Sequence, residues 1–294
     1  MRTARLYPQW GDTFEKVKTY LALACALVIS APQARGWGRR GHRLVNAAAV
    51  RALPEPLRSY FLAHKDYLVA HSIDPDLKAR NDPGEEMHHF TEGEAYDSFP
   101  FIRFRQEFVD EDRWPRPNEL RYGDSVWQID RLTHRLAQDF RRQDWRAVDY
   151  DAVFAAHYAA DLTQPLHTVL NFDGQLTGQA GLHARFETGV VNALAGQWVL
   201  AARPARDETN LRERIFQEYL ASTRKAVLIF GADRNARFGK TYSDPRFFSA
   251  FVKLMGPLAR RQLEDAASFV GSLWYTAWVE AGQPNLHRWP VSPR

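Results

Sequence analysis

Cysteine is nearly absent from this sequence, with one residue, Cys25, in 294. A single thiol cannot close an intramolecular disulfide, and Cys25 lies in an N-terminal segment that we expect to be removed. Lipid attachment at Cys25 is disfavoured, because the apolar run continues beyond it. The remaining chain therefore has neither a disulfide framework nor a thiol that could act as a nucleophile or a ligand.

Long hydrophobic runs are also missing. The longest apolar stretch, residues 20–31, has 12 residues, whereas a membrane-spanning helix needs about 20. Basic residues precede it and small residues follow it, which is typical of a secretory signal peptide. We expect residues 1–36 to be removed by cleavage after Gly36, with Ala34 as the alternative. The protein would then be exported, to the periplasm or the medium.

A strong net charge is missing as well. The full chain has 39 Lys and Arg against 35 Asp and Glu. Residues 1–36 contain five of these basic residues and two of the acidic ones, which leaves 34 against 33. The basic pI of the full sequence therefore carries little information about nucleic-acid binding.

What the sequence has instead is a helical period along most of its length. In residues 124–142 apolar side chains recur on one face behind Asp124 at the N-cap position, and Asp244 followed by Pro245 opens a last long stretch. No stretch alternates with period two for long. We therefore predict an all-α, single-domain multi-helix bundle over residues 37–282. Its helices are expected at 42–53, 124–142, 150–163, 182–200, 208–230 and from 244 onward.

Three segments are expected to lie outside these helices. Residues 93–121 are rich in proline and aromatic residues and are predicted to form a long loop. Residues 171–181 are predicted to form a glycine-rich loop between two helices, and residues 283–294 a loose tail. Gly256-Pro257 is expected to kink or split the last helix, because proline removes a helical hydrogen bond.

Ten histidines are present, and some of them are four residues before an acidic residue in the sequence. His157 and Asp161 are four residues apart, as are His183 and Glu187, so each pair projects from one helix face. One such pair is common and usually reflects a surface hydrogen bond, so only the joint pattern is informative. With no cysteine left, imidazole and carboxylate are the available metal ligands, and they suit a hydrolytic zinc site. Four further histidines lack a partner pattern and are interpreted as surface or hydrogen-bonded residues: His64, His71, His134 and His287.

Four motifs occur in order along about 150 residues: WGRRGH (37–42), HHF (88–90), HYAADLTQPLH (157–167) and GLHARFE (181–187). Together they resemble the metal-binding framework of the zinc-dependent phospholipases C and the related single-strand-specific nucleases of fungi and plants. The WGxxGH and HxxxD…QPLH patterns are the most specific. The resemblance implies a site with three zinc ions and hydrolysis of phosphodiester bonds by metal-activated water.

The resemblance also implies how the N-terminus takes part. Trp37 would bind one zinc ion through its free α-amino group and its carbonyl oxygen, and His42 and Asp161 would complete that ion. An amine is available for this only if no residue precedes Trp37. Export and cleavage would therefore be part of assembling the site, and the unprocessed chain would lack this ion or hold it weakly.

The other two ions are implied in the same way. Asp161 would bridge to a second ion, which the aspartate of the DPD turn would also bind; we favour Asp76 for this role, and Asp74 is the alternative. Asp161 or the DPD aspartate would orient or deprotonate the attacking water. The remaining ligands would be His89 and His157 for the second ion, and His167, His183 and Glu187 for the third.

The motifs divide between the two branches of this superfamily. The spacing in WGRRGH resembles the nucleases, whereas the short loop before GLHARFE and its final Glu187 resemble the phospholipases. We favour a nuclease for single-stranded DNA or RNA, with a phospholipase C as the first alternative and a non-catalytic zinc- or nucleic-acid-binding protein as the second. No protein partner is implied. Aromatic residues for either substrate are expected in or beside the 93–121 loop: Tyr96, Phe99, Phe101, Phe104, Trp114 and Tyr122.

Overall fold

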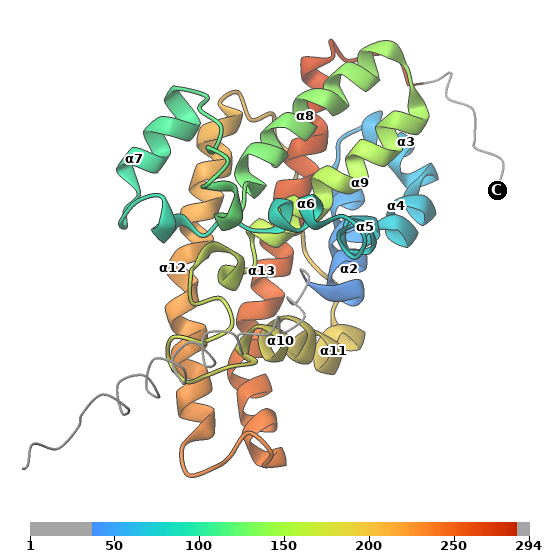
Figure 1. Cartoon of the computed structure of the whole chain (residues 1–294). Coiled ribbons are helices and arrows are strands. Elements are labelled where there is room, and N and C mark those ends of the chain that lie inside the picture. Colours follow the sequence, from blue (N-terminus) through green and yellow to red (C-terminus); the bar gives the residue numbers. More distant parts are fainter. Residues whose placement is uncertain (1–36, 287–294) are drawn as a thin grey trace, which may run out of the picture. The chain divides into compact units, whose positions relative to one another are not determined.

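The computed structural model describes residues 37–286, which belong to one compact unit, Arg35–Arg294. Within residues 37–286 every regular element is a helix and no strand is present (Figure 1), so the prediction of an all-α fold is confirmed. The expected signal peptide and its cleavage site lie outside the described residues. The same is true of His287 and the rest of the predicted tail, of which only residues 283–286 are described.

Short helices make up the first part of the described chain. Three of them, α2, α4 and α5, contact the later helix α9. Asp82 accepts a hydrogen bond from the backbone N–H of Gly84 and so caps the start of α6. The elements are α2 Gly38–Ala52, α3 Leu57–Ala63, α4 Lys65–His71, α5 Asp74–Ala79, α6 Pro83–Glu86 and the 3₁₀ turn η1 Met87–His89.

Four long helices form the centre. They are α8 Ser125–Arg142, α9 Trp145–Leu162, α12 Leu211–Arg237 and α13 Pro245–Glu280, and α13 packs against α2, α8, α9 and α12. The turn between α8 and α9 is tight, because Gln143 adopts a left-handed conformation and Asp144 caps the new helix through the N–H of Ala147. From Asp151 to Leu162 every residue of α9 is buried. The polar side chains on this part of α9 therefore lie in the interior of the protein.

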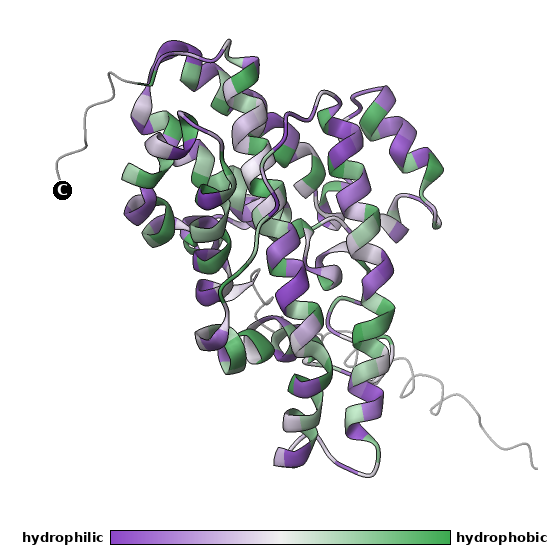
Figure 2. Ribbon diagram, turned by 180° about the vertical axis from the view of Figure 1, so that it is seen from behind, coloured by the Kyte–Doolittle hydropathy of each residue, from purple (hydrophilic) through white to green (hydrophobic). Residues whose placement is uncertain are grey.

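Aromatic stacking joins the helices at the core. The rings of Phe61 on α3 and Trp274 on α13 stack with centroids 4.6 Å apart, and the indole N–H of Trp274 donates to the carbonyl of Ala152 on α9. Figure 2 shows hydrophobic and hydrophilic residues alternating along the helices, as expected for helices with one buried face. Among residues 37–286, no helix combines the length and the apolar character needed to cross a bilayer.

Gly256-Pro257 is expected to kink or split the last helix. The helix is not split there. α13 runs through Pro257 from Pro245 to Glu280. Met255, Ala259 and Leu263 on both sides of the proline are buried. The cost of an internal proline is about 3 kcal/mol, and the tertiary contacts of a 36-residue helix offset it.

The prediction of a long loop over residues 93–121 is only partly correct, because residues 96–101 and 111–119 lie outside the helices and the rest of the segment is helical. Tyr96, Phe104 and Phe108 are buried, and the rings of all three contact Trp127 on α8. Aromatic burial orders the segment into short helical pieces in spite of its prolines. These pieces are η2 Gly93–Ala95, α7 Ile102–Arg105, the π-helical turn η3 Gln106–Asp110 and η4 Leu120–Tyr122.

The predicted helix over residues 182–200 is broken into shorter elements. It begins as α10 Leu182–Ala184, widens into the π-helical segment η6 Arg185–Val190 and continues as α11 Val191–Leu194 and η7 Ala195–Gln197. Residues 171–181 contain no helix, as predicted. π-Helical turns often accompany functional sites, and η6 contains Glu187.

Candidate metal centre

The histidines and acids singled out by their motifs converge on the last turns of α9. His157 and Asp161 lie one turn apart on this helix and are both fully buried. The chain then turns at Gln164 into the 3₁₀ turn η5 Pro165–Thr168, which brings His167 back toward the end of α9. The other members come from separate elements: His42 from α2, Asp76 from α5, His89 from η1, His183 from α10 and Glu187 from η6.

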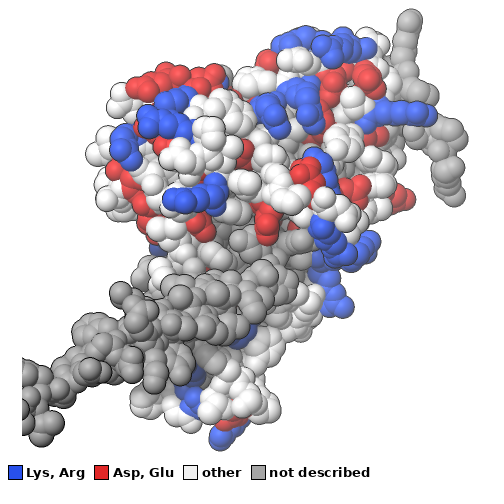
Figure 3. Space-filling view, in the orientation of Figure 1, with Lys and Arg blue, Asp and Glu red and all other residues white. Residues whose placement is uncertain are grey.

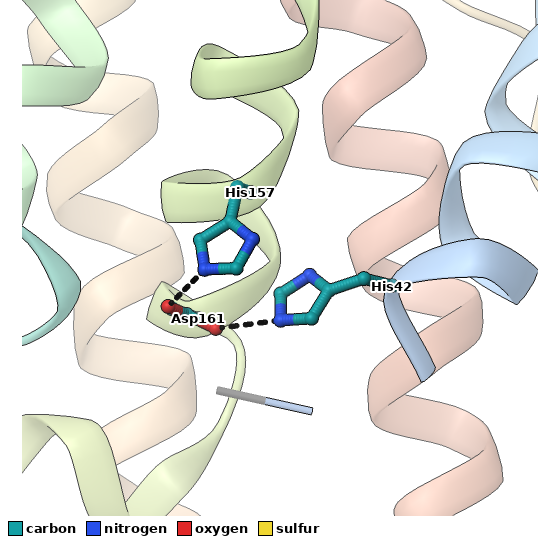
Figure 4. Close-up of side chains that lie close together, drawn as sticks. All are labelled: His42, His157 and Asp161. Carbon is teal, nitrogen blue, oxygen red and sulfur yellow. Dashed lines mark ion pairs between the residues drawn. The ribbon is translucent and has the colours of Figure 1, made fainter. Parts of the chain in front are cut away.

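The first cluster consists of His42, His157 and Asp161, whose ligand atoms lie within 4.8 Å of one another. His42 Nε2 is 3.3 Å from Asp161 Oδ1, and His157 Nε2 is 3.3 Å from Asp161 Oδ2. Figure 4 shows both imidazoles directed at the same carboxylate, one from α2 and one from α9. The two rings stack with centroids 3.9 Å apart.

The second cluster consists of Asp76, His89 and His157, so it shares His157 with the first. Asp76 Oδ1 lies 3.6 Å from His157 Nε2 and 3.9 Å from His89 Nδ1. His89 Nδ1 also lies 2.9 Å from Asp161 Oδ2. One oxygen of Asp161 therefore faces the first cluster and the other faces the second, an arrangement suited to a bridging carboxylate.

The third cluster consists of His167, His183 and Glu187. Glu187 Oε2 lies 2.7 Å from His183 Nε2 and 3.3 Å from His167 Nε2. Burial alone would raise the pKa of Glu187, but hydrogen bonds from the two imidazoles lower it to about 2. Burial would likewise lower the pKa of His167, and Glu187 instead raises it to about 9.

Gln164 is a member of this neighbourhood that the sequence did not single out as a functional residue. Its side-chain oxygen accepts from the N–H of Leu166, so its amide nitrogen must face the third cluster. That nitrogen lies 3.2 Å from Glu187 Oε2 and 3.0 Å from His183 Nε2. Gln164 is fully buried and orients the Glu187 carboxylate.

Backbone carbonyls fix the protonation of two imidazoles. His157 Nδ1 lies 2.8 Å from the carbonyl of Ser72, and His167 Nδ1 lies 2.6 Å from the carbonyl of His89. A carbonyl oxygen can only accept, so each Nδ1 carries a proton and donates it. The Nε2 atom of each ring is then left for the cluster, which is how metal-ligating histidines are usually oriented.

Electrostatics holds the buried carboxylate of Asp161 in its ionised form. Burial would raise its pKa, but the imidazoles of His157 and His42 hold that pKa well below its usual range. Burial would lower the pKa of His157, and the carboxylates of Asp161 and Asp76 hold it well above its usual range. The pKa of His89 is lowered, chiefly by burial. A buried carboxylate needs a cation beside it, and either an imidazolium proton or a metal ion can supply that charge.

The clusters also contain buried atoms whose hydrogen-bonding capacity is unused. Within residues 37–286, His89 Nε2, Glu187 Oε1 and His42 Nδ1 are buried and make no hydrogen bond. Each such atom costs about 1–3 kcal/mol, so their accumulation in one place is unusual for a purely structural core. Three sets of imidazole nitrogen and carboxylate oxygen fit the ligands of a multinuclear metal site.

Trp37 is fully buried at the N-terminal end of α2. Its indole N–H donates to the carbonyl of Ala160, at 2.9 Å, and lies 3.3 Å from the hydroxyl of Thr163. These contacts fasten Trp37 to the end of α9, beside Asp161. The state of its α-amino group depends on residues 1–36, which lie outside the described part.

The two alternatives in the DPD turn are clearly separated. Asp76 is buried and belongs to the second cluster. Asp74 lies outside all three clusters: its carboxylate accepts from His71 Nδ1 at 2.7 Å, and both side chains are more than one-third exposed. Two residues along a helix correspond to about 200° of rotation, so only one of the two aspartates of α5 can face α9.

The other histidines among residues 37–286 have acidic partners outside the clusters. His64 Nδ1 contacts Asp149, His71 contacts Asp74, and His134 lies between Asp130 and Glu280. His88, which precedes His89 in the HHF motif, contacts Asp124 instead of a cluster. Asp124 is at the N-cap position of α8 as predicted, but its side chain bonds to His88 and Gln128 and caps no backbone N–H.

The aromatic residues expected to bind substrate are mostly part of the core. Tyr96, Phe101 and Phe104 are buried, whereas Phe99 and Trp114 are exposed and Tyr122 is partly exposed. An aromatic residue that the sequence reasoning missed is Phe172, in the 171–181 loop. It is partly exposed, and its ring lies 6.1 Å from that of His183 at the third cluster. Its position four residues after the helical turn η5 gave no signal of this proximity.

Comparison with known proteins adds no assignment. No family model matches the sequence, and no curated protein matches it. The resemblance to the zinc-dependent phospholipases C and nucleases therefore stays a prediction.

Proposed function

We propose that this protein is an exported, zinc-dependent hydrolase of phosphodiester bonds that binds three zinc ions. The observation that supports this most is the convergence of eight buried imidazole and carboxylate side chains, from seven elements between α2 and η6, on one end of α9. A cluster of this kind in a protein interior is costly unless cations occupy it. The ligand set contains nitrogen and oxygen donors only, as in hydrolytic zinc sites.

The chain's own residues would have distinct tasks. Bound zinc would supply hydroxide near neutral pH and neutralise charge on the phosphate oxygens. Asp161 has no exposed surface and faces two clusters, so its task is to hold them at a fixed separation. Asp76, whose side chain is 10% exposed, is the acid of the three clusters with most access to solvent. We assign to Asp76 the orientation or deprotonation of the attacking water.

Single-stranded DNA or RNA is the substrate that we propose. The spacing in WGRRGH supports it, and the partly exposed Phe172 beside the third cluster offers a surface on which a base could stack, worth about 1–3 kcal/mol. On the face shown in Figure 3, basic and acidic residues are interspersed, so the charge pattern of that face favours no polyanion. Recognition would then depend on the site itself.

A phospholipase C is the second candidate. The observations that favour it are the short connection of residues 171–181 and the carboxylate of Glu187 in the third cluster. A zinc- or nucleic-acid-binding protein without catalysis is the third. Such a protein would need the same imidazole and carboxylate ligands, so turnover is the property that separates it from an enzyme.

One set of assays separates these candidates. The purified protein is analysed for metal and incubated with bis-p-nitrophenyl phosphate, single-stranded DNA, RNA and phosphatidylcholine vesicles, with and without a chelator. We expect zinc in the protein and chelator-sensitive cleavage of the nucleic acids. Hydrolysis of the vesicles alone would transfer the assignment to phospholipase C. Bound zinc without hydrolysis of any substrate would support the non-catalytic binding protein. A purified protein that contains no metal would contradict the proposal.

A further inference from the structure

The third cluster is supported by a different part of the protein from the first two. The first and second clusters share His157, and the elements that complete them, α2, α5 and η1, pack directly on α9. His183 and Glu187 instead belong to the segment α10–η6, which packs against α13. The site therefore has two structural supports, which meet at Gln164 and His167.

An ion pair between η6 and α12 fixes the second support. Asp233 on α12 is fully buried, and its Oδ1 accepts from Nε and Nη2 of Arg185 at 3.1 and 3.0 Å. Its Oδ2 accepts from the amide of Gln179 and from the hydroxyl of Tyr242, both at 2.9 Å. Four donors satisfy this one carboxylate, so little freedom remains in its position.

Arg185 is held on every side. Its guanidinium donates to the carbonyls of Ala180 and Gln179 as well as to Asp233, and it lies over the ring of Tyr242, 4.2 Å from the centroid. In the chain, Arg185 stands midway between the cluster residues His183 and Glu187. It therefore points away from the cluster while its backbone sets the separation of the two ligands.

We propose that the Arg185–Asp233 ion pair is the positioning device of the third metal site, and that its loss empties this site while the other two stay filled. This inference rests on the proposed function, because it presumes that the clusters bind metal. Without the carboxylate, the partly buried guanidinium of Arg185 would lose its charged partner, and the α10–η6 segment would shift. His183 and Glu187 would then no longer meet His167 within ligand distance. The first two clusters would be unaffected, since none of their residues touches Arg185 or Asp233.

Metal content measures this directly. The full chain, exported and purified, is compared with Asp233→Asn and with the milder Arg185→Lys, which keeps the charge but loses the paired hydrogen bonds. We expect about three zinc ions per chain in the unmodified protein and about two in Asp233→Asn. Arg185→Lys should bind the third ion about 10- to 100-fold more weakly. Should Asp233→Asn fail to fold, the Arg185→Lys titration alone decides.

A reference and a control make the result specific. His183→Ala removes a ligand of the third cluster and serves as the reference for a protein that lacks the third ion. It gives the number of zinc ions per chain, and after substitution with Co²⁺ the absorption spectrum, that are expected when this ion is missing. The double variant His183→Ala/Asp233→Asn should match His183→Ala alone, because both changes act on the same site. Asp151→Asn disrupts another ion pair of a buried aspartate, Arg135–Asp151 between α8 and α9, and should keep all three ions.

The outcomes separate this inference from the proposed function. Three ions in both Asp233→Asn and Arg185→Lys, with unchanged affinity, would overturn it and leave the proposed function intact. Equal loss of all three ions from folded Asp233→Asn would also overturn it, since the pair would then support the fold in general. An unmodified protein that binds no zinc would contradict the proposed function itself.

Discussion

Asp161 Oδ2 lies 2.9 Å from His89 Nδ1, although 72 residues separate the two in the chain. The contact joins η1 to α9 in the interior and places the carboxylate between two groups of imidazoles. Asp161→Asn keeps the size of the side chain but halves its capacity as a metal ligand. We expect turnover to fall by on the order of a hundredfold or more, because changes even outside the ligands cost 10- to 100-fold. Zinc analysis of the folded variant should show fewer ions, and full activity would remove the bridging role.

The two aspartates of α5 form a matched pair for testing the second cluster. Asp76→Asn removes a buried ligand and should lower turnover by about a hundredfold or more. Asp74→Asn removes only a partly exposed contact to His71 and should leave turnover within about twofold, since such surface pairs contribute little. The assay is hydrolysis of bis-p-nitrophenyl phosphate by both variants at saturating zinc. Equal effects of the two substitutions would contradict the assignment of Asp76.

Processing before Trp37 should matter for one ion. The indole of Trp37 is hydrogen-bonded to Ala160 and Thr163, which lie on either side of Asp161 in the chain. A variant with one glycine retained before Trp37 turns the amine into an amide, which is a far poorer ligand. We expect it to hold about two ions in place of three, as measured by zinc analysis after dialysis. N-terminal sequencing of the unmodified protein is the control, and an N-terminus other than Trp37 would contradict this prediction.

The stack of Phe61 and Trp274 should contribute strongly to stability. Trp274 is fully buried, and its indole N–H is bonded to Ala152. Trp274→Ala should lower the free energy of unfolding by about 3–5 kcal/mol, as for other large-to-small changes in a core. Urea denaturation measures the loss. Trp114→Ala, at a side chain that is 40% exposed, is the control and should change stability by less than about 1 kcal/mol.

His134 should make stability depend on pH in the alkaline range. Hydrogen bonding to Asp130, with Glu280 on the other side of the ring, raises the pKa of His134 to about 9 in the folded protein. The unfolded value is about 6.5. The stabilisation is therefore complete below pH 6.5 and is lost as pH rises through about 9.

The effect should be small, because the side chain of His134 is 47% exposed and water and salt screen the pair. His134→Gln should remove this part of the pH dependence, and urea denaturation at pH 6 and pH 9 measures it. A contribution of less than about 1 kcal/mol is expected. An unchanged difference between the two pH values in His134→Gln would show that another group is responsible.

The sequence by itself determined the helical class and most of the candidate site. Residues four apart on a helix must share a face, so the pairs His157/Asp161 and His183/Glu187 could be recognised without a structure. His183 and Glu187 still lie side by side, although Glu187 belongs to a π-helical segment and not to an α-helix. The absence of cysteine likewise limited the ligands to imidazole and carboxylate before any contact was known.

Tertiary structure decided the rest. Asp74 and Asp76 are the same residue type in the same helical turn, so the sequence does not distinguish them. Only the packing of α5 against α9 buries Asp76 in the interior of the protein. Composition predicted a loop over residues 93–121, yet long-range contacts with Trp127 bury its aromatic residues and order it. Gln164 and Arg185 lie within the motifs but were given no role there, and Asp233 lies outside all of them. Their importance comes from hydrogen bonds to residues far away in the chain, and such bonds exist only once the helices have packed.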